Sequence, residues 1–362
     1  TLTNEILRYI TEIEQNRYKV SSVKLSKTVM NKLRKNSKKK SSYASNKIEG
    51  NPLSEKQVNE VIESDERKHY LKPEQEVRNY FLALNYLEEK VKNKEKFSKQ
   101  LILDVQKLVE KGASKEKIGL RGPMPPGVLF AVYDSKTGNP DYIPPEYCDI
   151  PGLLDELVEY VNTTDDHPLI VAAVVHYQLV TIHPFEDGNG RTARLLSGYI
   201  MDLNGYGFNG IGSLEEYFAY DIDEYYESIQ MGLPALYYSG RENPPHPEIW
   251  INYFLRMVKL YSGKVCDLQL ASEEEDIAGS LSFLKGKEKE LLLFLMKNYR
   301  GEFTPIEISR ELSVTNKTII NRLTILVKNG FVIPILVNKR IRSYELSGFT
   351  KDHEKQIIKA IS

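Results

Sequence analysis

The chain has 362 residues, and its 49 lysines and arginines against 50 aspartates and glutamates give a formal net charge of −1. This balance argues against a protein built mainly for bulk phosphate binding. Hydrophobic residues make up 41% and charged residues 27%, which excludes a largely disordered chain. The length predicts two or three domains. No apolar run is long enough to span a bilayer, so we expect no membrane partner.

The N-terminal sequence and the cysteine content favour a cytoplasmic protein. Residues 1–15 carry acidic residues among apolar ones and lack the pattern of a signal peptide. Cys148 and Cys266 are the only cysteines, so no disulfide framework is indicated. A reduced, cytoplasmic setting therefore fits best.

Helical periodicity dominates the first third of the chain. Apolar spacing predicts helices over residues 2–18, 74–92 and 97–111. The basic run at 32–40 is interpreted as a solvated helix end or loop rather than a nucleic-acid contact. Gly50 is expected to end one helix, and Ser54 with Gln57 resembles a capping box that begins the next.

The middle of the chain interrupts the helical pattern once. Residues 128–134 are typical of a strand, and a turn and a return strand through Tyr142 complete a short β-hairpin. Beyond the hairpin, helices are predicted over 151–162, 168–182 and 190–203. The run of Val, Ala, Ile and Leu in the second of these indicates a buried central helix.

An acidic stretch near 268–285 indicates a connector to a second module. The sequence beyond it predicts helices over 286–298, after Pro305 and over 316–328, followed by strands at 331–337 and 342–346. This order resembles a winged helix. Its candidate phosphate and base contacts are Asn316, Lys317, Asn321, Arg322, Lys339, Arg340 and Arg342. Dimerisation or partner docking is an equally serious alternative for such a module.

Residues 183–194 read His-Pro-Phe-Glu-Asp-Gly-Asn-Gly-Arg-Thr-Ala-Arg. Gly188-Asn189-Gly190 is a tight turn in front of an apolar-periodic helix, where backbone N–H groups converge on the positive end of the helix dipole. The turn is therefore a candidate anion cradle. Arg191 and Arg194 share one face of the first helical turn and suit a polyphosphate.

Three other side chains of this segment have candidate roles. Asp187 would lie close to bound phosphates, where one or two carboxylates are typical Mg²⁺ ligands. His183 could face the same cavity, and an imidazole is the usual base for deprotonating a hydroxyl. Phe185 is expected to anchor the loop in the core. A glycine-rich turn with surface arginines and a structural histidine is the alternative, which the full string disfavours.

The segment matches the motif His-x-Phe-x-(Asp/Glu)-Gly-Asn-Gly-Arg-x-x-Arg at every defined position, and the chain is similar to the Fic family over about residues 40–265. The hairpin ending in Tyr142-Ile143-Pro144-Pro145 resembles the family's flap. The stretch Glu224-Tyr225-Tyr226 resembles the segment that closes the adenine side, with Asp221-Ile222 where the family often has Asn-Arg. The resemblance implies a mainly α, Fic-type helical bundle with one β-hairpin flap, followed by the winged helix-turn-helix (α+β) domain.

A second signature lies upstream, at Ser45-Asn46-Lys47-Ile48-Glu49-Gly50, which resembles the family's inhibitory motif (Ser/Thr)-x-x-x-Glu-(Gly/Asn). Ser45 and Glu49 are four residues apart and would share a helix face. The resemblance implies that Glu49 pairs with Arg194 and takes it away from the nucleotide. The same glutamate could instead help to remove AMP from a modified target. For these six residues alone, the alternative is a surface helix with a glycine cap.

The resemblance implies a protein adenylyltransferase that moves AMP from ATP to a Ser, Thr or Tyr hydroxyl of a target protein or of itself. His183 would take the hydroxyl proton, and Asp187 would hold Mg²⁺. Nucleotide binding would fall to Gly188, Asn189, Gly190, Arg191, Arg194 and Tyr225. The target would dock on the flap at 128–145 by strand addition. Alternatives are AMP removal, transfer of another nucleotide or of phosphocholine, and a DNA-binding regulator whose Fic domain senses nucleotide.

These expectations divide the chain into four parts. Residues 1–110 would form a helical region that carries the inhibitory motif, 111–267 the Fic core, 268–284 the acidic connector and 285–362 the winged-helix domain. A homodimer, and DNA contact through 304–342, are further expectations.

Overall fold

The structure, a computed structural model, describes residues 3–23, 25–114, 118–128, 130–133, 138, 140–233 and 244–361. It is 67% helix, which confirms the predicted mainly α class. Its contacts divide the chain into two units. The first comprises Thr1–Val20 with Leu33–Val265, and the second comprises Ser21–Lys32 with Cys266–Ser362.

The described residues of the first unit form helices and one small hairpin. Its elements are most of α1 (Asn4–Ser22), most of α2 (Lys27–Ile48), α3 (Glu55–Glu63), α4 (Lys72–Lys92), α5 (Lys99–Glu110), β1 (Val132–Tyr133), β2 (Pro140–Tyr142), α6 (Ile150–Thr163), α7 (Pro168–Ile182), α8 (Asn189–Leu203), a 3-10 turn (Phe208–Gly210), α9 (Glu215–Phe218), α10 (Ile222–Gln230) and the first part of α11 (Pro247–Ser282).

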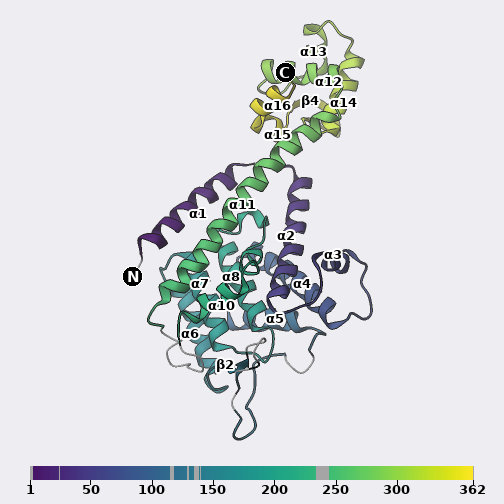
Figure 1. Cartoon of the computed structure of the whole chain (residues 1–362). Coiled ribbons are helices and arrows are strands. Elements are labelled where there is room, and N and C mark those ends of the chain that lie inside the picture. The colour runs from purple at the N-terminus through teal and green to yellow at the C-terminus, as the bar shows by residue number, and fades with distance from the viewer. Residues whose placement is uncertain are drawn as a thin grey trace. The chain divides into compact units, whose positions relative to one another are not determined.

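Helices α7 and α8 lie side by side at the centre of the first unit (Figure 1). Pro168 occupies the first turn of α7, where its missing N–H costs no hydrogen bond. Most side chains of α7 are buried, as its apolar sequence predicts. The Trp250 indole of α11 donates to the Ala173 carbonyl at 2.8 Å, so it completes the core around this helix.

The basic run lies in the middle of α2, so its interpretation as a helix end or loop was wrong. Successive helical residues point about 100° apart, and Lys38, Lys39 and Lys40 therefore reach different partners. These partners are Glu88, Glu63 and Glu216, respectively. The acidic partners come from other segments, which explains why local sequence did not reveal them.

The helix boundary predicted near Gly50 is confirmed. Helix α2 ends at Ile48, and Gly50 has φ +79°, a conformation that glycine adopts without strain. The next helix begins with the predicted capping box, in which the Ser54 N–H donates to Gln57 Oε1 at 2.9 Å. This sharp turn fixes the position of Glu49 just beyond the end of α2.

The predicted hairpin is present, with shorter strands. β1 and β2 are antiparallel, and Val132 lies opposite Tyr142. The Tyr142 hydroxyl donates to the Thr181 carbonyl at 2.5 Å, which attaches the base of the hairpin to α7. The predicted strand residue Asp134 and most of the predicted turn lie outside the described residues.

The second unit contains the predicted helices and strands of the C-terminal module. Its elements are the remainder of α11, α12 (Gly286–Asn298), α13 (Pro305–Glu311), α14 (Asn316–Lys328), β3 (Val332–Val337), β4 (Arg340–Leu346), α15 (Gly348–Asp352) and α16 (Glu354–Ile361). β3 and β4 form an antiparallel hairpin, and Phe303 bridges to Tyr344 of β4. Leu292 and Leu323 are fully buried where α12 packs on α14.

The stretch predicted as an acidic connector is helical as far as Ser282, because it forms the last turns of α11. Ile277 and Leu281, four residues apart, are buried in the core of the second unit. Glu273 is 2.8 Å from His353 Nε2, and Asp276 accepts a hydrogen bond from the Ser26 N–H at 2.8 Å. The high acidic content of the segment concealed this helical pattern.

Within the described part of the chain, no helix combines the length and the apolar character that crossing a membrane requires.

Candidate active site

The Gly188-Asn189-Gly190 turn forms the start of α8, as predicted. Gly188 has φ +82°, and its carbonyl accepts the Thr192 N–H at 2.9 Å in the first helical turn. The Asn189 amide exchanges two hydrogen bonds with the Phe185 backbone, at 3.0 and 2.8 Å. Phe185 is buried, which confirms its predicted anchoring role. Because the first N–H groups of a helix lack intrahelical acceptors, the turn presents backbone donors to an anion, while the Asn189 side chain holds the loop together.

His183 ends α7 in a left-handed conformation, with φ +48°. Its Nδ1 lies 3.2 Å from the Val180 carbonyl. A carbonyl can only accept a hydrogen bond, so Nδ1 carries the proton and Nε2 is the basic nitrogen. Burial lowers the pKa of His183 to about 4. The ring is therefore neutral near pH 7 and can accept a proton at Nε2.

Arg121, which sequence reasoning missed, holds the backbone carbonyls of His183 and of the residue that follows it. Its Nε donates to the His183 carbonyl and its backbone N–H to the Pro184 carbonyl, each at 2.9 Å. Its guanidinium also donates to Pro145 at the end of the flap. Arg121 thus joins the histidine to the hairpin, and no local motif marked it because its acceptors are carbonyls distant in sequence.

Asp187 lies beside the cradle. Its Oδ1 accepts the Gly188 N–H at 2.8 Å and lies 3.3 Å from Arg191 Nη2. The described residues contain no group of three His, Cys, Asp or Glu side chains placed to hold a metal ion alone. One carboxylate next to an anion cradle fits Mg²⁺, which takes its remaining ligands from phosphates and water.

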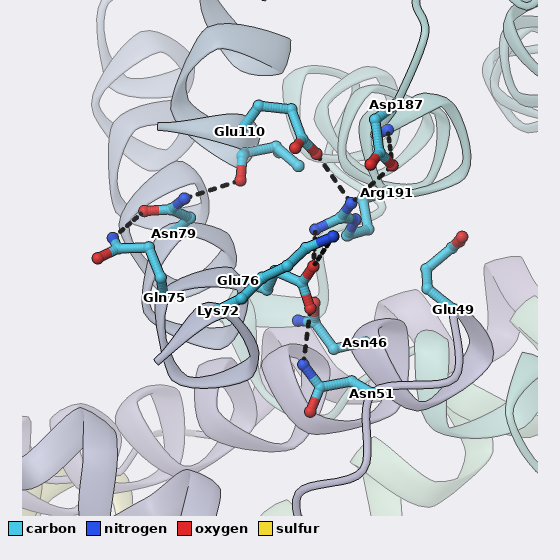
Figure 2. Close-up of polar contacts among 12 residues, drawn as sticks. Asn46, Glu49, Asn51, Lys72, Gln75, Glu76, Asn79, Glu110, Asp187 and Arg191 are labelled. Carbon is cyan, nitrogen blue, oxygen red and sulfur yellow. Dashed lines mark hydrogen bonds and ion pairs between the residues drawn. The ribbon is translucent and has the colours of Figure 1, made fainter. Parts of the chain in front are cut away.

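The two motif arginines have different surroundings. Arg191 lies among three carboxylates, those of Glu110, Asp187 and Glu76 (Figure 2). Its Nη2 lies 2.8 Å from Glu110 Oε1. Burial raises the pKa of Glu110 to about 7, although the charge of Arg191 opposes this shift. In this conformation the Arg191 side chain therefore connects α8 to α5.

Arg194 is paired with both predicted residues of the upstream signature. Its Nη2 lies 2.5 Å from Glu49 Oε1, and its Nε donates to Ser45 Oγ at 2.8 Å. Burial would lower the pKa of Arg194, but the Glu49 carboxylate, together with Tyr225 and Tyr80, raises it. A Cβ atom on Gly190 would lie only 2.4 Å from Glu49 Oε1. The Glu49 carboxylate therefore lies directly against the start of α8.

Tyr225 lies in a closed aromatic cluster rather than on an open nucleotide surface. It is 1% exposed, and its hydroxyl lies 2.8 Å from His176 Nε2 and 3.5 Å from Arg194 Nη1. Its ring packs against Phe218 and Trp250. His176 also approaches Ser197 through Nδ1, so both ring nitrogens of this buried histidine have polar partners.

Two further buried residues that sequence reasoning missed hold the segment that carries Ser45. The Tyr80 hydroxyl of α4 donates to Glu215 Oε1 at 2.9 Å. Glu215 Oε2 accepts from Ser41 of α2 at 2.8 Å. Both residues lie on ordinary amphipathic helices, and no local pattern distinguishes them from other helical positions.

Comparison with known proteins identifies the domain that contains this site. Residues 31–201 match the Fic/DOC family. This segment is a Fic domain. Protein adenylyltransferase Fic of Drosophila grimshawi is 26% identical over 206 residues, which are 55% of this chain and 40% of that protein. The Aedes aegypti protein of the same name is 28% identical over 202 residues, which are 54% of this chain and 38% of that protein.

A solved structure supports the same fold over most of the chain. A Fic family protein from Desulfovibrio desulfuricans has a TM-score of 0.58 at 20% identity, and the match covers 96% of this chain and 97% of that one. At this identity the likeness shows the fold alone. The chain spans about 40% of the length of the two insect relatives.

Proposed function

We propose that this chain is a protein adenylyltransferase, which transfers AMP from ATP to a Ser, Thr or Tyr hydroxyl of a target protein or of itself. One arrangement supports the proposal. A neutral His183 precedes in sequence the turn Gly188-Asn189-Gly190 with its backbone donors, and Asp187 lies beside them. The names of the relatives support the same chemistry.

The proposed reaction is an in-line displacement at the α-phosphorus of ATP. His183 Nε2 accepts the proton of the target hydroxyl, whose oxygen attacks phosphorus as pyrophosphate leaves. The backbone N–H groups at the start of α8 stabilise the negative charge on the α-phosphate. Asp187 would hold Mg²⁺, which neutralises phosphate charge when bound. Positioning and charge compensation supply most of the rate enhancement.

We further propose that Glu49 inhibits this reaction in the conformation described. Its carboxylate lies against Gly190 and pairs with Arg194. Arg194 is then unavailable to the γ-phosphate, and a negative charge lies where an anion would enter. ATP could still bind, but with its α-phosphorus displaced from the attacking hydroxyl. AMP removal that depends on Glu49 is the alternative use of the same residue.

The target segment is proposed to pair with the flap, which is described in part. β1 contributes two residues and β2 three, and Tyr133 of β1 is 61% exposed. Main-chain pairing would place a hydroxyl by backbone register, so several side-chain types could be modified.

The test is the intact mass of the Glu49→Gly protein after incubation with Mg²⁺ and ATP, GTP, CTP, UTP or CDP-choline in separate reactions. Gain of an AMP unit with ATP only supports the proposal. Modification by another donor would assign the site to a different transfer. Release of AMP from a modified protein by the wild-type chain, lost in Glu49→Gly, would favour the removal reaction.

Ser45→Ala is expected to relieve the proposed inhibition only in part. The substitution leaves the buried Arg194 Nε without its Ser45 Oγ acceptor at 2.8 Å but retains Glu49. Such a loss costs about 1–3 kcal/mol, and because Glu49 still pairs with Arg194 we expect the low end of this range, which corresponds to about five- to tenfold activation in initial rates of AMP transfer. Ser42→Ala is the matched control, because the Ser42 hydroxyl bonds the Lys38 carbonyl of the same helix. Equal activation by both variants would contradict the specific role of Ser45.

The pH profile of the Glu49→Gly protein is expected to be flat between about pH 6 and 8. Burial lowers the pKa of His183 to about 4, so its basic form already predominates throughout that range. The rate should fall only as the pH approaches that lowered pKa and Nε2 becomes protonated. Initial rates at constant ionic strength test this expectation, and a midpoint near the usual histidine pKa of about 6.5 would contradict it.

The C-terminal unit supports a second candidate function, which is either DNA binding or the docking of a protein. Six of its seven predicted contact residues are exposed, and Arg322 is half-buried. They would suit DNA contact through 304–342 if the module is a winged helix. The hairpin of β3 and β4 also exposes two apolar side chains, Leu336 and Ile341, whose exposed fractions are 60% and 53%. These side chains suit docking of a protein or of a second copy of the chain. DNA binding, homodimerisation and the winged-helix assignment remain predictions.

A further inference from the structure

Three carboxylates from different parts of the chain surround Arg191, and we call this group the Arg191 cluster. Its members are Glu76 of α4, Glu110 of α5 and Asp187 of the motif loop, with Arg191 of α8 between them (Figure 2). The distances are unequal. Arg191 Nη2 lies 2.8 Å from Glu110 Oε1 and 3.3 Å from Asp187 Oδ1, whereas Nη1 lies 4.0 Å from Glu76 Oε1.

The guanidinium of Arg191 is buried yet incompletely bonded. Its side chain is 4% exposed, and that of Glu110 is 0% exposed. Among the described residues, Arg191 Nε and Nη1 and Glu110 Oε2 have no hydrogen-bond partner. A single nitrogen, Nη2, thus serves both Glu110 and Asp187. If one of its carboxylate partners is neutralised, we expect the buried guanidinium of Arg191 to move toward a carboxylate that is still charged.

Glu110 is held rigidly at the end of α5. The amide nitrogen of Asn79 donates to the carbonyls of Val109 and Lys111, on either side of Glu110, at 2.8 Å each. Gln75 donates to Asn79 Oδ1 at 2.7 Å and so fixes the orientation of that amide. The backbone that carries Glu110 therefore cannot easily follow a movement of Arg191.

Glu110 also lies directly beneath the anion cradle. A Cβ atom on Gly188 would lie 2.8 Å from Glu110 Oε1, and only the absence of a side chain at this position leaves room for the carboxylate. The same oxygen contacts Arg191. Glu110 therefore supports both the start of α8 and the arginine next to Asp187.

We propose that Glu110 is a positioning residue that competes with Asp187 for Arg191, weakens the contact between Arg191 and Asp187, and thereby favours the binding of a divalent cation at Asp187. This inference rests on the proposed function, in which Asp187 holds the cation that accompanies the nucleotide. Without the charge of Glu110, Asp187 at 3.3 Å is the nearer remaining carboxylate, because Glu76 is at 4.0 Å. Arg191 then competes with the cation for Asp187.

The test measures Mn²⁺ binding in the presence of ATP, by the paramagnetic resonance signal of free Mn²⁺, in the Glu49→Gly background. It is made above about pH 8, where the Glu110 carboxyl is charged although burial raises its pKa to about 7. Loss of an outer-shell partner typically costs 10–100-fold in metal affinity, so Glu110→Gln should raise the half-saturating Mn²⁺ concentration at least about tenfold. Glu76→Gln is the matched control and should change it by less than about threefold, because its contact with Arg191 is longer.

A double variant separates positioning from a general loss of structure. In Glu110→Gln/Arg191→Gln the competing cation is absent, so half-saturation, measured at an ATP concentration that saturates each protein, should return to within about threefold of the parent. A merely structural role for Glu110 would make the double variant at least as defective as the single one. Thermal unfolding of each protein checks that it is folded. If Glu110→Gln does not fold, Glu110→Asp replaces it in the test. Its shortened carboxylate should still raise the half-saturating Mn²⁺ concentration about threefold.

The outcomes distinguish this inference from the proposed function. Unchanged half-saturation in the folded Glu110 variant, or no restoration in the double variant, overturns the role of Glu110 while AMP transfer by the parent still stands. Absence of ATP-dependent Mn²⁺ binding in the Glu49→Gly parent overturns both proposals.

Discussion

Replacing Glu49 with glycine is expected to raise the rate of AMP transfer about a hundredfold or more, since small displacements of reacting atoms have effects of this size. In the structure, Glu49 Oε1 lies 2.5 Å from Arg194 Nη2 and against Gly190. Removing the side chain frees the guanidinium and removes a negative charge from the place that an anion would occupy. The measurement is the initial rate of AMP incorporation at saturating ATP and Mg²⁺.

Glu49→Gln separates the effect of charge from that of space. Glutamine fills nearly the same volume and can still accept a hydrogen bond from Arg194, but it lacks the negative charge. If the negative charge causes the inhibition, the rate of Glu49→Gln should approach that of Glu49→Gly. If the volume of the side chain causes it, the rate of Glu49→Gln should stay near that of wild type. Glu60→Gly, which removes an exposed glutamate of α3, controls for nonspecific effects of the substitution. An initial rate for Glu49→Gly no higher than that of wild type would refute the inhibitory role.

The parts of the site that sequence could predict are those held by local geometry. The anion cradle follows from two glycines in front of a helix, and His183 and Asp187 lie within a few residues of it. The contact between Glu49 and Arg194 spans 145 residues, and it was predicted only because the upstream signature resembles a known motif. Its geometry, with Ser45 and Glu49 on one side of Arg194, agrees with their spacing of four residues.

The parts that sequence could not predict depend on side chains brought together by the fold. Arg191 was expected to face phosphate, but it is directed toward Glu110, which is 81 residues away on a helix with no distinguishing motif. The same reason explains the ion-paired lysines Lys38 and Lys39 of α2, whose acidic partners lie on other segments. Periodicity specifies which face of a helix is buried, but it does not specify which polar side chain a neighbouring helix supplies.

Replacing His183 is expected to reduce AMP transfer by about 10²–10⁴-fold in the Glu49→Gly background, the usual contribution of a general base. Nucleotide binding should change by no more than about twofold, because the proposed base acts on the target hydroxyl rather than on the phosphates. The two measurements are the initial rate of AMP incorporation and the dissociation constant for ATP with Mg²⁺.

The choice of substitution matters because His183 has φ +48°. Alanine is strained in this left-handed region, whereas asparagine adopts it readily, so His183→Asn preserves the loop better than His183→Ala. The exposed His246 lies outside the motif, and His246→Asn is therefore a matched control. Loss of transfer in both His183 variants, with ATP binding retained, would assign the proton transfer to this ring. Retention of transfer in His183→Asn would show that another group or water removes the proton, and the neutral imidazole would then lose its proposed role.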